Sequence, residues 1–187
     1  MTNNYLEQRP QVADEYESRP SPVSSIELRR AAGQFATGVT IISALDRNAQ
    51  PYGMTASSFC SLSLDPPLIQ WSLSTDSYSY PIFADAGYFA VNVLAANQKD
   101  ISRNFCKPID RFATTSTVHG LEGLPLIEGC LAWLECKLEK RVQGGDHTIF
   151  IGKVLRARVF NGEPLLHWQG AYLLSEPCRE GNGFRQG

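Results

Sequence analysis

Two long segments of alternating residues constrain the fold of this chain most. Between residues 131 and 142, apolar residues alternate with charged ones: Leu134, Cys136 and Leu138 against Glu135, Lys137 and Glu139. The sequence Gly144-Gly145-Asp146-His147 then marks a turn, and residues 148–160 return. Such alternation is typical of strands with one buried face, and a short turn joins antiparallel neighbours. These residues predict a long antiparallel hairpin with the charged side chains on its polar face.

Further strands are expected where β-branched or alternating residues recur between turn signals. They cover residues 39–44, 52–59, 68–73, 88–94 and 165–168. The turn signals are Asp46-Arg47-Asn48, Asp65-Pro66-Pro67 and Asn161-Gly162. About seven strands joined mostly by short turns predict a mainly β fold, an antiparallel β-barrel with a few short peripheral helices.

Three short helices are expected beside the strands. Ser24 and Glu27 have the spacing of a capping box, and Gly38 is the expected end of that first helix. Its expected apolar face consists of Leu28, Ala31, Ala32 and Phe35. A second helix opens in the serine-rich segment 74–79 and ends near Phe83, and a third covers residues 97–105. Residues 107–129 are expected to form an irregular stretch with a long loop.

The length of 187 residues argues for one domain. Residues 1–23, with three prolines and little apolar patterning, are expected to form a flexible arm. The domain then covers residues 24–176, and residues 177–187 form a tail.

Charge and cysteine content exclude several classes of partner. The net charge is −2, and the residues from Ser24 onward carry equal numbers of basic and acidic side chains. Nucleic acids and anionic membrane surfaces attract basic patches, so neither is an expected partner. The five cysteines (Cys60, Cys106, Cys130, Cys136 and Cys178) contain no Cys-x-x-Cys pair and no zinc-like spacing. With no signal peptide or apolar span visible, reduced thiols, no metal and a cytoplasmic location are expected.

No motif for a common enzyme class is present. The sequence lacks Gly-x-Gly-x-x-Gly, a Walker A motif and a Gly-x-Ser-x-Gly elbow. Its three histidines, His119, His147 and His167, are far apart. The residues alone therefore predict an antiparallel β-barrel and leave its function open.

Seven stretches in order resemble one family, over about residues 25–175. They are residues 35–40 (FATGVT), 53–59 (GMTASSF), 63–68 (SLDPPL), 89–94 (FAVNVL), 110–112 (DRF), 145–154 (GDHTIFIGKV) and 164–166 (PLL). Together they resemble the short flavin reductases, which are reductase components of two-component flavin-dependent monooxygenases. The resemblance implies a split β-barrel, usually a homodimer, that binds FMN or FAD. It also implies NADH or NADPH as reductant and a partner monooxygenase that receives reduced flavin.

Three groups of cofactor-binding residues are expected: the resemblance implies the first and the third, and the second is a cluster of hydroxyls at the start of a short helix. The first, along the flavin ring, is Met54, Thr55, Ala56, Ser57 and Ser58; the second, near ribityl or phosphate, is Ser72, Ser74 and Ser77; the third is Ser102, Arg103, Asn104 and Phe105. Small residues and hydroxyls let a backbone approach a ring and bind a phosphate. Without the resemblance, the first group is an ordinary strand and the serines are turn and capping residues. Arg103 or Lys107 could neutralise a phosphate, or Arg103 could be a solvated charge.

His147 is the implied catalytic residue, placed at the nicotinamide, with protonation of reduced flavin as a secondary role. From the residues alone, a histidine in such a turn is exposed and inert. Arg111 either reaches a dinucleotide phosphate or braces its loop, and Trp133 and Cys136 are core or dimer-interface residues.

Two other functions stay open. The same barrel could pass electrons from flavin to another acceptor, such as a ferric chelate or a corrinoid. A non-catalytic flavin-binding protein is the second alternative, against which His147 and the open Gly144-Gly145 turn argue.

Overall fold

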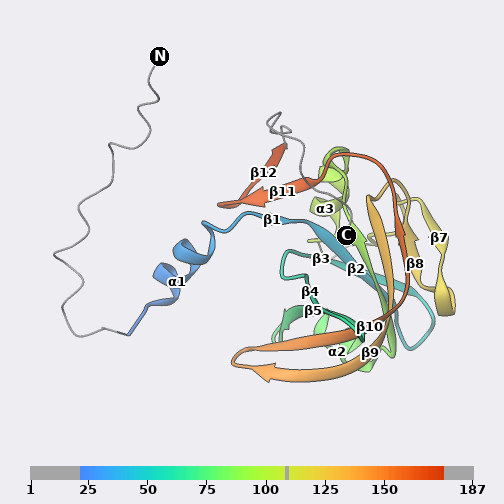
Figure 1. Cartoon of the computed structure of the whole chain (residues 1–187), viewed down its shortest axis with the longest axis horizontal. Helices are drawn as coiled ribbons and strands as arrows, with labels where there is room; N and C mark the ends of the chain where they lie inside the picture. Colours follow the sequence, from blue (N-terminus) through green and yellow to red (C-terminus); the bar gives the residue numbers. More distant parts are fainter. Residues whose placement is uncertain (1–21, 108–109, 175–187) are drawn as a thin grey trace, which may run out of the picture.

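The computed structural model describes residues 22–107 and 110–174 (Figure 1). The expected arm, apart from residues 22 and 23, lies outside this range. So do the expected tail and Cys178.

One large antiparallel sheet forms the body of the protein (Figure 1). Its seven strands are β2 (Thr40–Leu45), β3 (Pro51–Ala56), β4 (Cys60–Leu64), β5 (Pro67–Ser74), β6 (Tyr88–Val93), β9 (Ala132–Gly144) and β10 (His147–Val159). Their order across the sheet is β3-β2-β6-β9-β10-β5-β4. The long hairpin predicted from alternation is β9–β10, at the centre of this sheet.

Two smaller sheets and short helices flank the body. Strands β1 (Thr37–Gly38), β11 (Leu165–Trp168) and β12 (Ala171–Leu174) form one sheet, and β7 (Thr117–His119) and β8 (Pro125–Ile127) the other. The helices are α1 (Ser25–Ala32), α2 (Tyr80–Asp85) and α3 (Lys99–Asn104), with 3₁₀ turns η1 (Ala96–Gln98) and η2 (Leu121–Gly123). This mainly β, antiparallel architecture with few short helices confirms the predicted fold class.

Several short strands were missed from the sequence. In β4, four of the five residues are exposed, because it is the edge strand of the large sheet. An edge strand with no buried face shows no clear alternation of apolar and polar residues. Strands β7 and β8 have only three residues each, within the stretch expected to be irregular.

Helix α1 begins as predicted but ends early. The Ser24 hydroxyl oxygen accepts from the Glu27 amide, and the Glu27 carboxylate accepts from the Ser24 amide, which confirms the capping box. The helix ends at Ala32, so the expected end at Gly38 was wrong. Glycine disfavours the helix at Gly33, and Thr37–Gly38 instead pair with β11. No residue of α1 is buried, so its expected apolar face contacts no core.

Both faces of the large sheet are covered, because consecutive residues on β2 belong to different clusters. Ile41 packs with Phe105 in one cluster and Ile42 with Trp71 in the other. The Trp71 ring stacks on Phe150 at a centroid distance of 4.5 Å. The sheet is therefore a rigid support for the residues at its edges and turns.

Glu135 departs from the expected polar face of β9. It is 5% exposed, accepts a hydrogen bond from the Leu121 amide, and pairs with Arg156 at 2.9 Å. Alternation placed it with Lys137 and Glu139, but the segment containing η2 covers this position. A buried carboxylate with these two partners holds that segment against the sheet.

Candidate functional site

The expected flavin-binding strand lies beside α3. The Thr55 hydroxyl on β3 donates a 2.7 Å hydrogen bond to the Ser102 carbonyl oxygen in α3. The first and third predicted groups of residues are thus neighbours in space, although 47 positions separate these two residues.

The loop after β3 is joined to β5 by a reciprocal pair of hydrogen bonds. The Ser58 hydroxyl donates to the Ser72 carbonyl oxygen and accepts from the Ser72 amide, each at 3.0 Å. The second predicted group therefore adjoins the first. The neighbouring strand in the sheet, β10, adds the catalytic candidate, because His147 on β10 pairs with Ser74 on β5.

The residues of β3 and of the loop after it differ in exposure, which determines which of them a ligand could touch. Ser57 and Ser58 are exposed, and Thr55 and Met54 are half-buried. Ala56 is buried, and Met54 packs on the core cluster of Trp71. The Ser57 hydroxyl is therefore available just after β3, whereas that of Ser58 is bonded to Ser72. Apolar packing supports the middle of the strand.

The serines of the second group cap their own turn. The Ser74 hydroxyl oxygen accepts from the Asp76 amide at 3.3 Å, and the Ser77 hydroxyl oxygen accepts from the Ser79 amide at 3.2 Å. This geometry agrees with the capping role that the residues alone suggested. Among the described residues neither hydroxyl has a hydrogen-bond acceptor, so each O–H can donate to a ribityl or phosphate oxygen.

Two members of the third group have buried side chains. Ser102 is fully buried, with its hydroxyl 2.8 Å from that of Tyr172. Phe105 is 1% exposed and packs on Phe112. A Cβ at Gly53 would lie 2.7 Å from the Phe105 ring. The Phe105 ring packs against β3 at Gly53, the Ser102 hydroxyl contacts Tyr172, and neither side chain presents a surface to a ligand.

The polar members of the third group face outward. Arg103 lies 3.7 Å from the Asp100 carboxylate, and its guanidinium lies 5.9 Å from the Tyr172 ring centroid. Asn104 is half-buried and Lys107 is exposed. With its side chain half exposed, Arg103 remains able to meet an anion.

Arg111 braces its loop. Its Nε donates to the Lys107 carbonyl oxygen at 2.7 Å, and its Nη1 donates to the Gly53 carbonyl oxygen. Its guanidinium also lies 5.1 Å from the Tyr52 ring centroid. These contacts support the bracing alternative and hold β3 at Gly53.

His147 begins β10, and its ring is held by the preceding residue. Its Nδ1 lies 2.7 Å from the Asp146 carboxylate. The hydrogen bond to His147 and its charge lower the pKa of Asp146. The carboxylate therefore stays ionised and favours one orientation of the imidazole.

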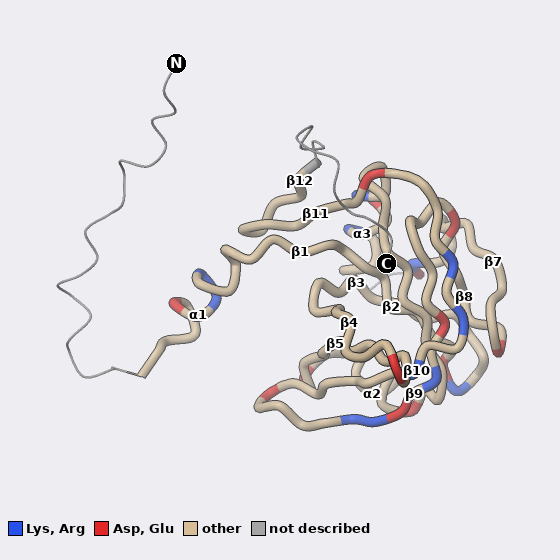
Figure 2. Tube along the Cα trace, viewed as in Figure 1, with Lys and Arg blue, Asp and Glu red and all other residues tan. Residues whose placement is uncertain are grey.

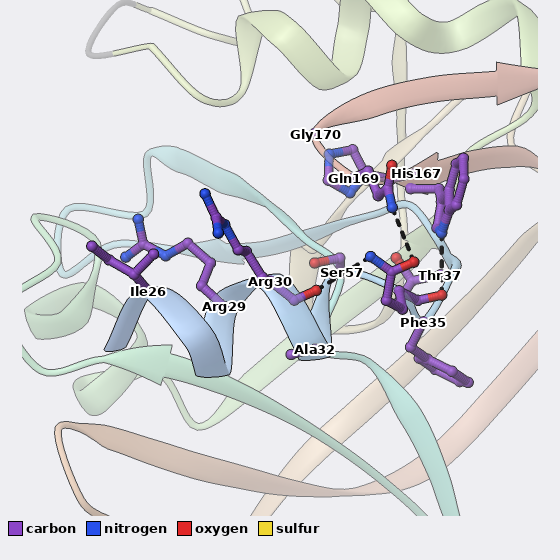
Figure 3. Close-up of a pocket in the computed structure, with 13 residues that line it drawn as sticks. Ile26, Arg29, Arg30, Ala32, Phe35, Thr37, Ser57, His167, Gln169 and Gly170 are labelled. Carbon is purple, nitrogen blue, oxygen red and sulfur yellow. Dashed lines mark hydrogen bonds between the residues drawn. The ribbon is translucent and has the colours of Figure 1, made fainter. Parts of the chain in front are cut away.

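A separate cleft of about 810 Å³ lies between α1 and the β11–β12 turn (Figure 3). Arg29 and Arg30 border it on α1, with His167 and Gln169 opposite (Figure 3). Of the predicted site residues, only Ser57 lines it. The other candidates meet along β3, β5, α3 and the β9–β10 turn instead.

The described residues, 22–107 and 110–174, contain neither a cluster of metal ligands nor a membrane-spanning helix. No group of three or more His, Cys, Asp or Glu side chains there could hold a metal ion. No helix in that part of the chain has the length and apolar character needed to cross a bilayer. Acidic and basic residues are interspersed over the described part of the chain, between long stretches without charge (Figure 2).

Comparison with known proteins gives a consistent result. A family model described as flavin reductase like domain matches residues 32–173. The chain is 46% identical over 68% of its length to a probable flavin reductase of Rhizobium meliloti. It is 44% identical over 78% to the reductase component of a flavin-dependent trigonelline monooxygenase of Acinetobacter baylyi. The chain spans about half the length of these two relatives, 41% and 47%.

Other matches extend over most of both chains. An FMN reductase (NADH) of Agrobacterium fabrum is 41% identical over 82% of this chain and 87% of its own. Among solved structures, the NADH:FAD oxidoreductase of Streptomyces globisporus in complex with NAD and FAD fragments superposes with a TM-score of 0.80. It is 37% identical, over 87% of this chain and 99% of that one.

Proposed function

The chain belongs to the flavin reductase like domain family, and from that premise we propose that it is an NAD(P)H-dependent flavin reductase. It transfers hydride from nicotinamide to FMN or FAD and supplies the reduced flavin to a separate monooxygenase. The observation that supports this is the meeting of the three residue groups and His147. Thr55 is bonded to Ser102, Ser58 to Ser72, and Ser74 pairs with His147.

The residues present fit a flavin. Ser57 offers an exposed hydroxyl just after β3. The O–H groups of Ser74 and Ser77 have no acceptor among the described residues and can donate to ribityl or phosphate oxygens. Arg103 supplies a half-exposed positive charge on α3. A bound flavin supplies the hydride-accepting ring, while the protein supplies binding and orientation.

His147 is proposed to hold the nicotinamide. The ionised Asp146 favours a hydrogen on Nδ1, and in the imidazole tautomer that carries its hydrogen there, Nε2 is an acceptor. Such an acceptor suits a carboxamide N–H. The side chain is about half exposed, so a ligand can reach it.

The partner and the cofactor pair are also proposals. One relative is named as the reductase component of a monooxygenase, another names FMN and NADH, and one similar structure names FAD. Accordingly FMN or FAD, and NADH or NADPH, are the expected pairs. A cytoplasmic location stays a prediction from the sequence.

A homodimer is proposed from α1. Val23, Ile26, Leu28 and Phe35 on and beside this helix are 62–78% exposed. The helix lies apart from the sheets (Figure 1). Because apolar side chains this exposed are costly in water, a second copy of the chain is the proposed cover.

Flavin-dependent oxidation of NADH or NADPH by the purified protein tests the function. Turnover that saturates with added FMN or FAD is the expected result. If flavin binds but neither nucleotide is oxidised, a non-catalytic flavin-binding protein replaces this proposal. If turnover requires a ferric chelate or a corrinoid as well as flavin, the protein is a reductase for that acceptor.

A further inference from the structure

The carbonyl oxygen of Asp146 accepts two hydrogen bonds from one residue, Thr75. The Thr75 amide donates at 3.0 Å and the Thr75 hydroxyl at 3.1 Å. Thr75 directly follows β5, and Asp146 lies in the turn between β9 and β10. A carbonyl held by two donors fixes the plane of its peptide, which here joins Asp146 to His147.

That peptide determines where the imidazole of His147 points. The His147 and Asp146 side chains are 46% and 86% exposed, so little packing holds either of them. Their 2.7 Å contact fixes them relative to each other, while the backbone fixes the pair relative to the sheet. Thr75 therefore acts on the imidazole through the backbone.

Thr75 also belongs to the serine-rich turn. The Ser77 amide donates to the Ser74 carbonyl oxygen at 3.1 Å, and the Asp76 amide donates to the Ser74 hydroxyl at 3.3 Å. This turn is thus bonded within itself, and Thr75 joins it to the turn of His147. The serine-rich turn is the proposed flavin contact, and the turn of His147 is the proposed nicotinamide contact.

We propose that Thr75 is a positioning residue for hydride transfer, which sets the imidazole of His147 relative to the flavin-contacting serines. The inference rests on the proposed function, because it takes Ser74 and Ser77 as flavin contacts and His147 as the nicotinamide contact. Thr75 itself touches neither ligand in this role.

Other contacts hold the hairpin without the Thr75 hydroxyl. The hydroxyls of Tyr80 and Thr148 lie 3.1 Å apart, and the side-chain amide of Gln143 donates to the Gly145 carbonyl oxygen at 2.7 Å. The β5–β10 ladder also continues away from the turn to Lys153 and Leu68. Loss of one hydroxyl should therefore leave the protein folded.

The test compares Thr75→Val with Thr75→Ser. Valine keeps the shape and the backbone amide but removes the hydroxyl donor, whereas serine restores the donor. At saturating flavin, T75V should raise the KM for the preferred nicotinamide nucleotide about 2- to 10-fold, the effect of one net hydrogen bond. T75S should return KM to within about 2-fold of the wild type.

Two controls distinguish an effect on the position of His147 from a general loss of protein stability. In a His147→Ala background, T75V should change KM no further, because Thr75 acts through His147. Tyr80→Phe removes the side-chain bond between Tyr80 of α2 and Thr148 of β10, and should lower Tm while leaving KM unchanged. An equal rise of KM in Y80F, or an additive effect of T75V on H147A, would overturn the proposal.

A readout without turnover keeps this inference separable from the proposed function. The ring-nitrogen NMR signals of His147, assigned by their loss in H147A, should shift in T75V and not in Y80F. Signals unchanged in T75V would refute the positioning role even if the wild type is an active reductase. A wild type that oxidises neither NADH nor NADPH would instead refute the proposed function, whatever these signals show.

Discussion

The hydroxyl of Thr55 on β3 and the carbonyl of Ser102 in α3 are joined by a 2.7 Å hydrogen bond. This bond sets the separation between a strand with exposed hydroxyls and a helix that presents Arg103. A ligand that touches both elements depends on that separation.

Thr55→Val should therefore weaken flavin binding. Loss of the donor leaves the partly buried Ser102 carbonyl without this partner and costs about 1–3 kcal/mol, shared between stability and binding. We expect the Kd for the preferred flavin, measured by quenching of flavin fluorescence, to rise several-fold. Ser43→Ala is the matched control, since it removes a buried 2.6 Å bond to the Pro125 carbonyl oxygen on another part of the sheet. Equal flavin Kd values for the two variants would contradict the role given to Thr55.

Gly53→Ala tests the packing beneath β3. A Cβ there would lie 2.7 Å from the Phe105 ring and 3.2 Å from that of Phe112, so β3 or the rings must move. Overpacking of this kind costs about 1–3 kcal/mol, and we expect a lower Tm together with weaker flavin binding. Gly38→Ala is the control, because a Cβ at that position meets nothing within 4 Å. A G53A protein with wild-type Tm and flavin Kd would show that the rings yield freely.

His147→Ala should reduce turnover and leave flavin affinity unchanged. The imidazole lies at the turn beside Ser74, and the proposal gives it the nicotinamide rather than the flavin. We expect a fall of about 10-fold or more in kcat/KM for the nicotinamide nucleotide. His119→Ala, on the exposed strand β7, is the matched control and should keep full activity. Full turnover in H147A would remove His147 from the site.

How much of this structure can be predicted from the sequence depends on whether the interactions are local or join segments that are distant in the chain. The β9–β10 hairpin and the capping box at Ser24 are local patterns, and both were found. The burial of Glu135 was not predicted, because Arg156 and the Leu121 amide reach it from other segments. Periodicity records alternation along one strand but not which segment later covers it.

The same limit applies within the candidate site. The resemblance implies Ser102 and Phe105 as members, but only the fold reveals that both side chains are buried, with the Phe105 ring packed against β3 at Gly53. Thr75 gave no local signal, because its partner Asp146 lies 71 positions away in the chain. For Arg111 the sequence leaves two roles open, and the bond to Gly53 supports the bracing one.

Burial should protect two of the cysteines from alkylation. Desolvation raises the pKa of Cys130 and of Cys136 to about 12, so both thiols stay protonated at neutral pH. Cys60 and Cys106 are exposed. Mass spectrometry after brief iodoacetamide treatment at neutral pH should find label on the two exposed thiols and not on the two buried ones. With rising pH, labelling of Cys130 and Cys136 should increase only when the protein unfolds. Modification of either thiol in the native protein would contradict their burial in the core.

The exposed side chains of α1 give the test of the proposed dimer. Leu28 is 62% and Phe35 78% exposed, and neither belongs to the core clusters of the chain. Introducing a charge at each, in a Leu28→Asp/Phe35→Asp variant, should convert a dimer into a monomer in light scattering, because a buried unpaired carboxylate destabilises an apolar interface. Val159→Asp is the matched control: Val159 is 83% exposed at the end of β10, away from α1, and its variant should stay dimeric. A wild type that is monomeric at micromolar concentration would refute the dimer itself. A double variant that remains dimeric would place the interface elsewhere and leave α1 without the cover that its apolar side chains require.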